Sequence, residues 1–414
     1  MTSTPRLAHG PATQTTRTRQ SNRVHETGHR DNHAAVLDSA HVGDISGAFG
    51  TIRQNASEPT TLSAKLRILL AIVGPGLIVM VGDNDAGAFS TYTQAGQNFG
   101  THLLWTLPLL IPVLYVNQEM VLRLGAVTGV GHARLILERF GKFWGAFSVI
   151  DLFLLNALTI VTEFIGITLA TGYLGLPKIP SVILATLAIV GAAATGSFRR
   201  FERVCLTLVA ASFVLVPLYL MVHPSFTNMA KGLVVPSLPH GAPLSTVMLL
   251  IIGIVGTTIA PWQLFFQQSY VIDKRITPAY IRYERIDLWI GIGIVIVGAA
   301  AIIGFSAATF IHGTGHGHFT NAIGVAQGLA HHVSRLAGVL FAIALLDASI
   351  IGAAAVGLST AYAGADVTGV NHSLHRPVHQ AKGFYLGYGA LMAISAAIVL
   401  VPGTPLGLIT EAVQ

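Results

Sequence analysis

The chain has 414 residues, of which 52% are hydrophobic and only 10% are Asp, Glu, Lys or Arg. Soluble domains usually contain about 25% charged residues, so this composition excludes a soluble globular protein. The single cysteine, Cys205, excludes an internal disulfide and a cysteine-rich metal cage. The formal net charge of +6 has to be interpreted by its position along the chain.

Residues 1–64 differ in composition from the rest of the chain. They are rich in Thr, Ser, Arg, His and Asn and lack apolar periodicity, which predicts a disordered N-terminal tail. The segment from His25 to His29 matches the H-E-x-x-H pattern of zinc proteases. It contains Gly28 and lies in this polar tail, so we interpret it as a chance match in a solvated segment.

From residue 66 onward, apolar runs recur with polar breaks between them. Each run approaches the ~20 residues that an α-helix needs to cross a bilayer, and none alternates with the period of two that a barrel requires. The predicted fold class is therefore an all-α polytopic membrane domain over residues 65–414. We predict nine spans: 66–98 and 246–271, each with an interruption, and 102–122, 143–173, 180–197, 204–222, 288–311, 336–362 and 384–402.

Lysine and arginine are distributed unequally between the two sets of loops, and this asymmetry predicts the orientation. Loops after even-numbered helices contain thirteen of them and the opposite loops three. The tail and the even-numbered loops should therefore be cytoplasmic, and the basic charge reflects topology, with no nucleic-acid partner. The cytoplasmic set is Arg123, Arg134, Arg139, Lys142, Arg199, Arg200, Arg203, Lys274, Arg275, Arg282, Arg285, Arg376 and Lys382; the other is Lys178, Lys231 and Arg335.

Acidic residues inside apolar segments are the strongest candidates for function, because a carboxylate at the bilayer centre costs ~2.5–3.5 kcal/mol. Glu119 and Arg123 are spaced i,i+4, which predicts a structural ion pair. Asp151 is either a packing partner or part of a polar pathway. Asp347 either carries protons or pairs with a polar group. The full set is Asp83, Asp85, Glu119, Asp151, Glu163 and Asp347.

Two of the predicted spans are interrupted near their middles. Gly82-Asp83-Asn84-Asp85-Ala86-Gly87-Ala88 combines two acids with glycines, which disfavour helix, and Pro261 removes a hydrogen bond from the sixth span. Interrupted helices at corresponding places in two oppositely oriented halves indicate a transporter site near the membrane midplane. The alternative is an ordinary proline kink together with a buried acid pair.

At these positions the sequence resembles the natural resistance-associated macrophage protein (NRAMP) family of divalent-metal transporters. The matching segments are Asp85-Ala86-Gly87-Ala88 in the first span, Glu163-Phe164-Ile165-Gly166 in the third and Ala260-Pro261-Trp262-Gln263 in the sixth. The resemblance implies a leucine-transporter type fold of two inverted five-helix repeats. It also implies alternating access and the uptake of divalent cations, often together with protons.

The resemblance also implies which residues form the site, and where this chain departs from the family. Asp85 retains the ligand aspartate, whereas Ala88 and Ala260 replace the family's asparagine and methionine, as in a branch that carries magnesium. Thr257 would contribute its carbonyl. Ile160 stands where the family has a second acid, which weakens the case for proton coupling. Ala86, Gly87 and Pro261 would line the site, and Glu163 and Asp347 are candidates for a proton or polar pathway.

The chemistry of these residues supports the same interpretation independently. Thioether sulfur favours soft transition metals, whereas carboxylate, carbonyl and water ligands suit magnesium and manganese. Magnesium is usually held by one or two carboxylates and keeps several waters, for which Ala88 and Ala260 leave room. Asp83 and Gln263 are candidates for further oxygen contacts.

Histidines gather in two predicted loops, and we interpret them as solvated loop residues. Imidazoles can bind metal ions, but these have neither a partner acid nor a fixed spacing. The groups are His312, His316, His318, His331 and His332 on the external side, and His372, His375 and His379 on the cytoplasmic side.

These observations predict a secondary-active importer of divalent cations, with Mg²⁺ or Mn²⁺ favoured, in a prokaryotic cell membrane. Its partners would be the cation, membrane lipid and protons as a candidate coupling ion, and it needs no cofactor. A carrier of amino acids or other small solutes with the same fold is the alternative, and an intramembrane metal hydrolase is disfavoured. Residues 66–222 supply five helices of one repeat and 246–414 only four of the next, so we expect the native chain to continue past Gln414.

Overall fold

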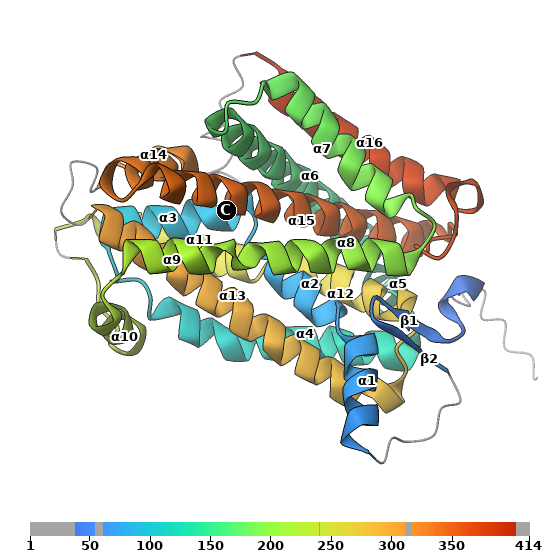
Figure 1. Ribbon diagram of the computed structural model, residues 1–414. Helices are drawn as coiled ribbons and strands as arrows, with labels where there is room; N and C mark the ends of the chain where they lie inside the picture. Colours follow the sequence, from blue (N-terminus) through green and yellow to red (C-terminus); the bar gives the residue numbers. More distant parts are fainter. Residues whose placement is uncertain (1–37, 54–60, 240, 311–316, 403–414) are drawn as a thin grey trace, which may run out of the picture. The chain divides into compact units, whose positions relative to one another are not determined.

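The computed structural model describes residues 38–53, 61–239, 241–310 and 317–402, and these are mostly helical (Figure 1). The first half contains α1 (Leu62–Ile72), α2 (Pro75–Gly82), α3 (Ala86–Phe99), α4 (Thr106–Thr128), α5 (His132–Phe140), α6 (Lys142–Tyr173), α7 (Lys178–Ala193), α8 (Phe198–Ala211) and α9 (Leu215–Val222). The second half contains α10 (Phe226–Val234), α11 (Leu244–Thr258), α12 (Pro261–Asp273), α13 (Ile281–Phe310), α14 (Ala322–His332), α15 (Arg335–Thr368) and α16 (Lys382–Leu400).

Every predicted span coincides with helix, so the all-helical membrane fold is confirmed. Among the described residues, seven helices are long and apolar enough to cross a membrane, counting α8–α9 and α11–α12 as one each. The bent pair α1 and α2 makes an eighth, and α7 is a shorter apolar helix. Three helices, α5, α10 and α14, lie between the spans in sequence and were not predicted.

Both predicted interruptions are present. α2 ends at Gly82 and α3 begins at Ala86, and the Asp85 side chain caps α3 by accepting the Ala88 amide at 2.9 Å. In the sixth span α11 ends at Thr258 and Pro261 occupies the first turn of α12. Proline is favoured at that position because it needs no hydrogen-bond donor there. Pro261 therefore starts a second helix and does not kink a continuous one.

The long helix α15 lies at the centre of the packing, next to α6, α14, α12 and α16, while α13 packs on α2 and α3 (Figure 1). α15 is also the most buried of the candidate spans. Its middle has the sequence Gly352-Ala353-Ala354-Ala355, and small residues let neighbouring backbones approach closely. This close packing brings the two interrupted spans together around α15.

The predicted disorder of residues 1–64 is wrong for the segment 38–53. β1 (Ile45–Gly47) and β2 (Gly50–Ile52) form an antiparallel hairpin, whose Ile45 and Ile52 are buried with residues of α1. Arg203 donates to the Ala48 carbonyl at 3.0 Å. A few apolar residues and partners from distant helices order this segment. Neither feature can be recognised from the sequence of the segment itself. The H-E-x-x-H match at His25–His29 lies outside the described residues.

Candidate functional site

Three polar residues occupy the interruption between α2 and α3, and all are buried: Asp83 is 0% exposed, Asn84 7% and Asp85 6%. Glu163 of α6 approaches this break and accepts the Ala86 amide at 3.2 Å. The side chains of Asp85 and Glu163 also share a hydrogen bond. A hydrogen bond between two carboxyl groups requires a proton on one of them, so Asp85 and Glu163 are a candidate pair for sharing one.

Asp83 is held by the other interrupted span. Its Oδ1 accepts a hydrogen bond from Nε2 of Gln263, while its Oδ2 has no partner among the described residues. The amide oxygen of Gln263 in turn accepts from Gln118 of α4 at 2.9 Å. Gln263, which is predicted to offer an oxygen to a metal ion, here presents its NH₂ group to Asp83 and its oxygen to Gln118, and its role as a ligand stays a prediction. Gln263 thus positions the acid.

The end of α11 contributes backbone and hydroxyl groups to the site. Thr257 is half-buried, and its carbonyl has no helical donor four residues on, because that residue is Pro261. Next to it, Thr258 is fully buried and its hydroxyl bonds the Tyr92 hydroxyl of α3 at 2.7 Å. Ala260 is half-buried between the two helices. The Thr257 carbonyl stays available as a ligand.

Gly352 of α15 packs tightly against Asp85 and Glu163. A methyl group added there would lie 2.9 Å from Asp85 Cβ and 2.9 Å from Glu163 Oε2. Gly166 plays a similar part, since a methyl group on it would lie 2.6 Å from Ala86 Cβ. The acid pair therefore sits in a slot that only glycine permits.

The structure joins some of the predicted site residues and separates others. It brings Asp83 together with Gln263, and Asp85 with Ala88 and Glu163. Asp347 of α15 is elsewhere: it lines a cavity with Asn84, and no hydrogen bond links it to Glu163 among the described residues. The proton or polar pathway through Glu163 and Asp347 therefore stays a prediction.

Several contributors were not predicted, and the sequence signal for each is weak. Gln118 is an isolated amide in an apolar span, Tyr92 lies seven residues after Asp85 on one face of α3, and Gly352 is one of many glycines. No group of three or more His, Cys, Asp or Glu side chains in the described residues is arranged to hold a metal ion. A cation here would rely on two acids, backbone carbonyls and water.

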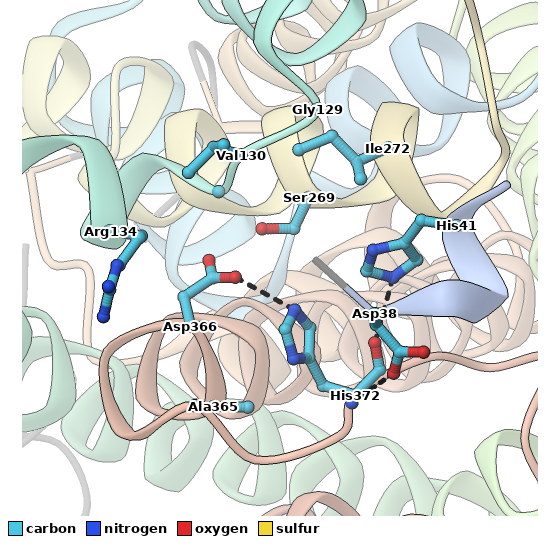
Figure 2. A pocket seen from close by; sticks show the side chains of 12 residues that line it. Asp38, His41, Gly129, Val130, Arg134, Ser269, Ile272, Ala365, Asp366 and His372 are labelled. Atoms are coloured by element: carbon cyan, nitrogen blue, oxygen red, sulfur yellow. Dashed lines mark hydrogen bonds and ion pairs between the residues drawn. The ribbon is translucent and has the colours of Figure 1, made fainter. Parts of the chain in front are cut away.

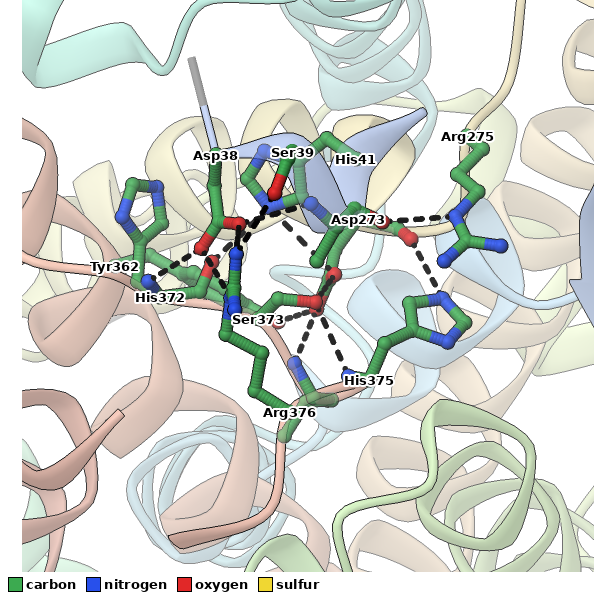
Figure 3. A network of polar contacts seen from close by, with 12 residues as sticks. Asp38, Ser39, His41, Asp273, Arg275, Tyr362, His372, Ser373, His375 and Arg376 are labelled. Carbon is green, nitrogen blue, oxygen red and sulfur yellow. Dashed lines mark hydrogen bonds and ion pairs between the residues drawn. The ribbon is translucent and has the colours of Figure 1, made fainter. Parts of the chain in front are cut away.

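A second polar network binds the segment 38–53 to the ends of α12 and α15 (Figure 3). Arg376 pairs with Asp38 at 2.5 Å, and His41 Nε2 donates to the His372 carbonyl at 3.0 Å. Asp273 accepts hydrogen bonds from three groups. These donors are the Tyr362 hydroxyl at 2.6 Å, the Ser373 hydroxyl at 2.5 Å and the Leu374 amide at 2.8 Å.

Two of the predicted solvated histidines belong to this network. His372 is 7% exposed, donates to Asp366 at 2.9 Å and lies against a small pocket that Asp38 and His41 also line (Figure 2). His375 donates to the Asp273 carbonyl at 3.1 Å. The interpretation as solvated loop residues is therefore wrong for both. Their partners come from other elements, so the sequence could not reveal them.

The charges in this network are fixed by their neighbours. Burial opposes ionisation of Asp38, but hydrogen bonds from Arg376 and the Ala40 amide lower the pKa of Asp38 to about 2. Burial also opposes the charged form of His372, yet the hydrogen bond and charge of Asp366 outweigh it and raise the pKa of His372 to about 9. Burial lowers the pKa of both His41 and His375. At neutral pH His372 is the cationic histidine here.

This difference predicts a pH dependence of stability. A folded pKa of about 9 for His372, above its usual 6.5, means that its stabilisation is complete below pH 6.5 and is lost as the pH rises through 9. We expect the unfolding temperature to fall between pH 6.5 and pH 9, with His372→Gln reducing that fall by ~2–4 °C. Thermal unfolding followed by intrinsic fluorescence would measure it, and an equal fall in both proteins would contradict the assignment.

The fold agrees with comparisons to known proteins. The manganese transporter of Eremococcus coleocola superposes with a TM-score of 0.63 at 21% identity, covering 86% of this chain and 81% of that protein. Mhp1, a nucleobase-cation-symport-1 family transporter, superposes with a TM-score of 0.51 at 16% identity, covering 82% and 75%. At these identities the likeness shows the fold, which is the leucine-transporter type predicted above.

Sequence comparisons give the family. The divalent metal cation transporter MntH 1 of Pseudomonas aeruginosa is 32% identical over 308 residues, which are 69% of this chain and 67% of the relative. MntH of Ralstonia nicotianae is 33% identical over 298 residues, or 68% and 65%. The chain thus spans about two thirds of the length of these relatives, which are named as transporters and not as enzymes. The Nramp model, natural resistance-associated macrophage protein-like, matches residues 76–414. The chain therefore belongs to the Nramp family.

Proposed function

We propose that this protein imports divalent metal cations across the cell membrane by alternating access, with the N-terminus in the cytoplasm. One observation carries the proposal: two buried acids, Asp83 and Asp85, occupy the interruption of one span, and Asp83 contacts the interruption of another through Gln263. Buried carboxylates in a membrane need a partner, and Asp83 Oδ2 has none among the described residues. The names of the two relatives, as divalent metal cation transporters, agree with it.

The ligands favour a hard cation. Asp85, Asp83 and the Thr257 carbonyl would supply only oxygen, and Ala88 and Ala260 provide no sulfur or amide. Magnesium and manganese accept such ligands, and magnesium in particular retains waters that small side chains accommodate. We therefore propose Mg²⁺ or Mn²⁺ as the transported ion, held partly hydrated between the two interruptions.

The Asp85–Glu163 pair offers a route for coupling to protons. The two carboxyl groups share one proton in their hydrogen bond. A divalent cation that binds Asp85 takes up the carboxylate that accepts this hydrogen bond from Glu163. The proton then remains on Glu163, from which it can leave when the site opens to the cytoplasm. We propose this pair, without Asp347, as the place where protons and cations meet.

Uptake into liposomes tests the function. Purified protein in vesicles loaded with a divalent-ion indicator should admit Mn²⁺ or Mg²⁺, with an internal pH dye reporting any proton movement. Empty vesicles and vesicles with Asp85→Asn protein serve as controls. Uptake of radiolabelled amino acids with no cation signal would instead support the alternative carrier of the same fold.

The absence of a sulfur ligand leads to a prediction about selectivity between Cd²⁺ and Mg²⁺. Ala260→Met restores a thioether beside the site, so Cd²⁺ binding should strengthen by roughly 10-fold while Mg²⁺ uptake weakens because the cavity shrinks. Isothermal titration would measure Cd²⁺ binding, and the indicator-loaded vesicles would measure Mg²⁺ uptake. Ala260→Leu is the matched control, because it adds similar bulk without sulfur. Tight Cd²⁺ binding by the unmodified protein, insensitive to excess Mg²⁺, would contradict an oxygen-only site.

A further inference from the structure

The side chain of Gln118 is a buried amide in the apolar helix α4. It is 1% exposed, and its Nε2 donates to Oε1 of Gln263 at 2.9 Å. Its own amide oxygen has no hydrogen-bond partner among the described residues. Burial of an amide costs free energy that hydrogen bonds must offset, and here one acceptor stays unsatisfied. An apolar side chain would carry no such cost, so packing alone does not account for Gln118.

The neighbours of Gln263 show why this hydrogen bond matters. Nε2 of Gln263 donates to Oδ1 of Asp83 and, at 3.3 Å, to the carbonyl of Thr258. A backbone carbonyl only accepts hydrogen bonds, so the part of the amide that faces it must be the NH₂ group. The amide oxygen of Gln263 then points to the other side, where Gln118 supplies its donor. If the amide turned over, its oxygen would face the Thr258 carbonyl and the Asp83 carboxylate without a donor.

We infer that Gln118 is a positioning residue of the cation site, which holds the Gln263 amide with its NH₂ group toward Asp83. Gln118 itself makes no hydrogen bond to Asp83 or Asp85 in the described part of the chain, so it acts through Gln263. The relay connects α4, which packs on α12, to the break between α2 and α3. Buried hydrogen bonds in such a chain are stronger than in water and polarise one another. This role rests on the proposed transport of a cation that binds between the two interruptions.

The test replaces Gln118 by methionine in the full chain, reconstituted in phosphatidylcholine nanodiscs. Methionine keeps an unbranched side chain of similar length and removes the donor. The Gln263 amide then loses its fixed orientation, so we expect the dissociation constant for Mn²⁺ to rise about 10-fold, as for one lost hydrogen bond. Isothermal titration with MnCl₂ measures this constant. In vesicle uptake the KM should rise by the same factor with the maximal rate unchanged, because cation binding is weakened and turnover is not.

A double variant shows whether Gln118 acts through Gln263. Gln263→Met should also weaken Mn²⁺ binding, and adding Gln118→Met to it should cause no further loss, because the group that Gln118 positions is already gone. Two independent contributions would instead multiply, and the double variant would then bind Mn²⁺ about 10-fold more weakly than Gln263→Met alone. That result would overturn the inference.

Asn156→Leu is the matched control, because it removes another buried amide from a membrane helix. Asn156 is 2% exposed, and its hydrogen bonds go to the Thr360 hydroxyl at 2.8 Å and the Val356 carbonyl at 3.5 Å, away from the cation site. Its Mn²⁺ affinity should equal that of the unmodified protein. Unchanged affinity in Gln118→Met, or a lower maximal rate with an unchanged KM, would overturn the inference and leave the proposed function intact. Failure of the unmodified protein to bind Mn²⁺ or Mg²⁺ would count against the proposed function, and the inference would fall with it.

Discussion

Replacing Asp85 by asparagine is expected to abolish divalent-cation uptake while the protein remains folded in the membrane. The substitution keeps the size and the capping acceptor for the Ala88 amide, but it removes the negative charge closest to Glu163. In a site shielded from water, the lost attraction for a doubly charged ion should lower uptake by on the order of 100-fold or more. Vesicle uptake at subsaturating Mn²⁺ and Mg²⁺ would measure the effect.

Two control variants test whether the loss of uptake depends on where the removed charge lies. Asp151→Asn removes a membrane acid that is exposed on α6, and it should transport normally. Asp83→Asn should reduce uptake less than Asp85→Asn, because Gln263 already engages one of its oxygens. Size-exclusion chromatography would confirm that each variant is folded. Undiminished transport by the Asp85 variant would show that the cation binds elsewhere.

A single methyl group on α15 should have the second-largest effect. Gly352→Ala places a carbon 2.9 Å from both Asp85 Cβ and Glu163 Oε2, so the acid pair must move. Overpacking of this kind costs about 1–3 kcal/mol, and we expect uptake to fall roughly 10-fold or more because the acids leave their shared hydrogen bond. Initial uptake rates at several cation concentrations would show whether binding or turnover suffers.

The same helix provides the matched control. Gly364 also lies in α15, but a methyl group there has nothing within 4 Å. Gly364→Ala should leave uptake unchanged and stabilise the protein slightly, because alanine favours helix by ~1 kcal/mol over glycine. Normal uptake by Gly352→Ala would mean that the slot around Asp85 and Glu163 is wider than this packing indicates.

Some features of the site could be predicted from the sequence because they depend only on neighbouring residues in the chain. Asp83, Asp85 and Pro261 interrupt long apolar runs, so their role in the breaks follows from local chemistry. The ion pair of Glu119 and Arg123 was predicted from i,i+4 spacing and is confirmed at 2.6 Å. Arg285 joins the same carboxylate at 2.6 Å from another helix, and no local pattern indicates that.

Residues that act across helices were the ones missed. Gln118 touches Gln263 from 145 positions away, and Gly352 meets Glu163 only because α15 packs on α6. Their sequence neighbourhoods are ordinary apolar helix. The hairpin at 45–52 was missed for the same reason, since its order depends on Arg199 and Arg203 of α8. Long-range pairing has no short-range signature, which limits sequence reasoning to the interruptions themselves.

The hairpin and the residues just before it belong to the same folded unit as the helices. Buried Glu202 accepts the Ala48 amide at 2.5 Å and pairs with buried Lys274 at 2.6 Å, while Asp38 neutralises Arg376. A shortened protein starting at the first apolar helix would therefore leave Arg376 without its carboxylate and the Glu202 carboxylate one donor short. The practical boundary for expression, tagging or domain transplantation lies before Asp38, some two dozen residues ahead of the first hydrophobic helix.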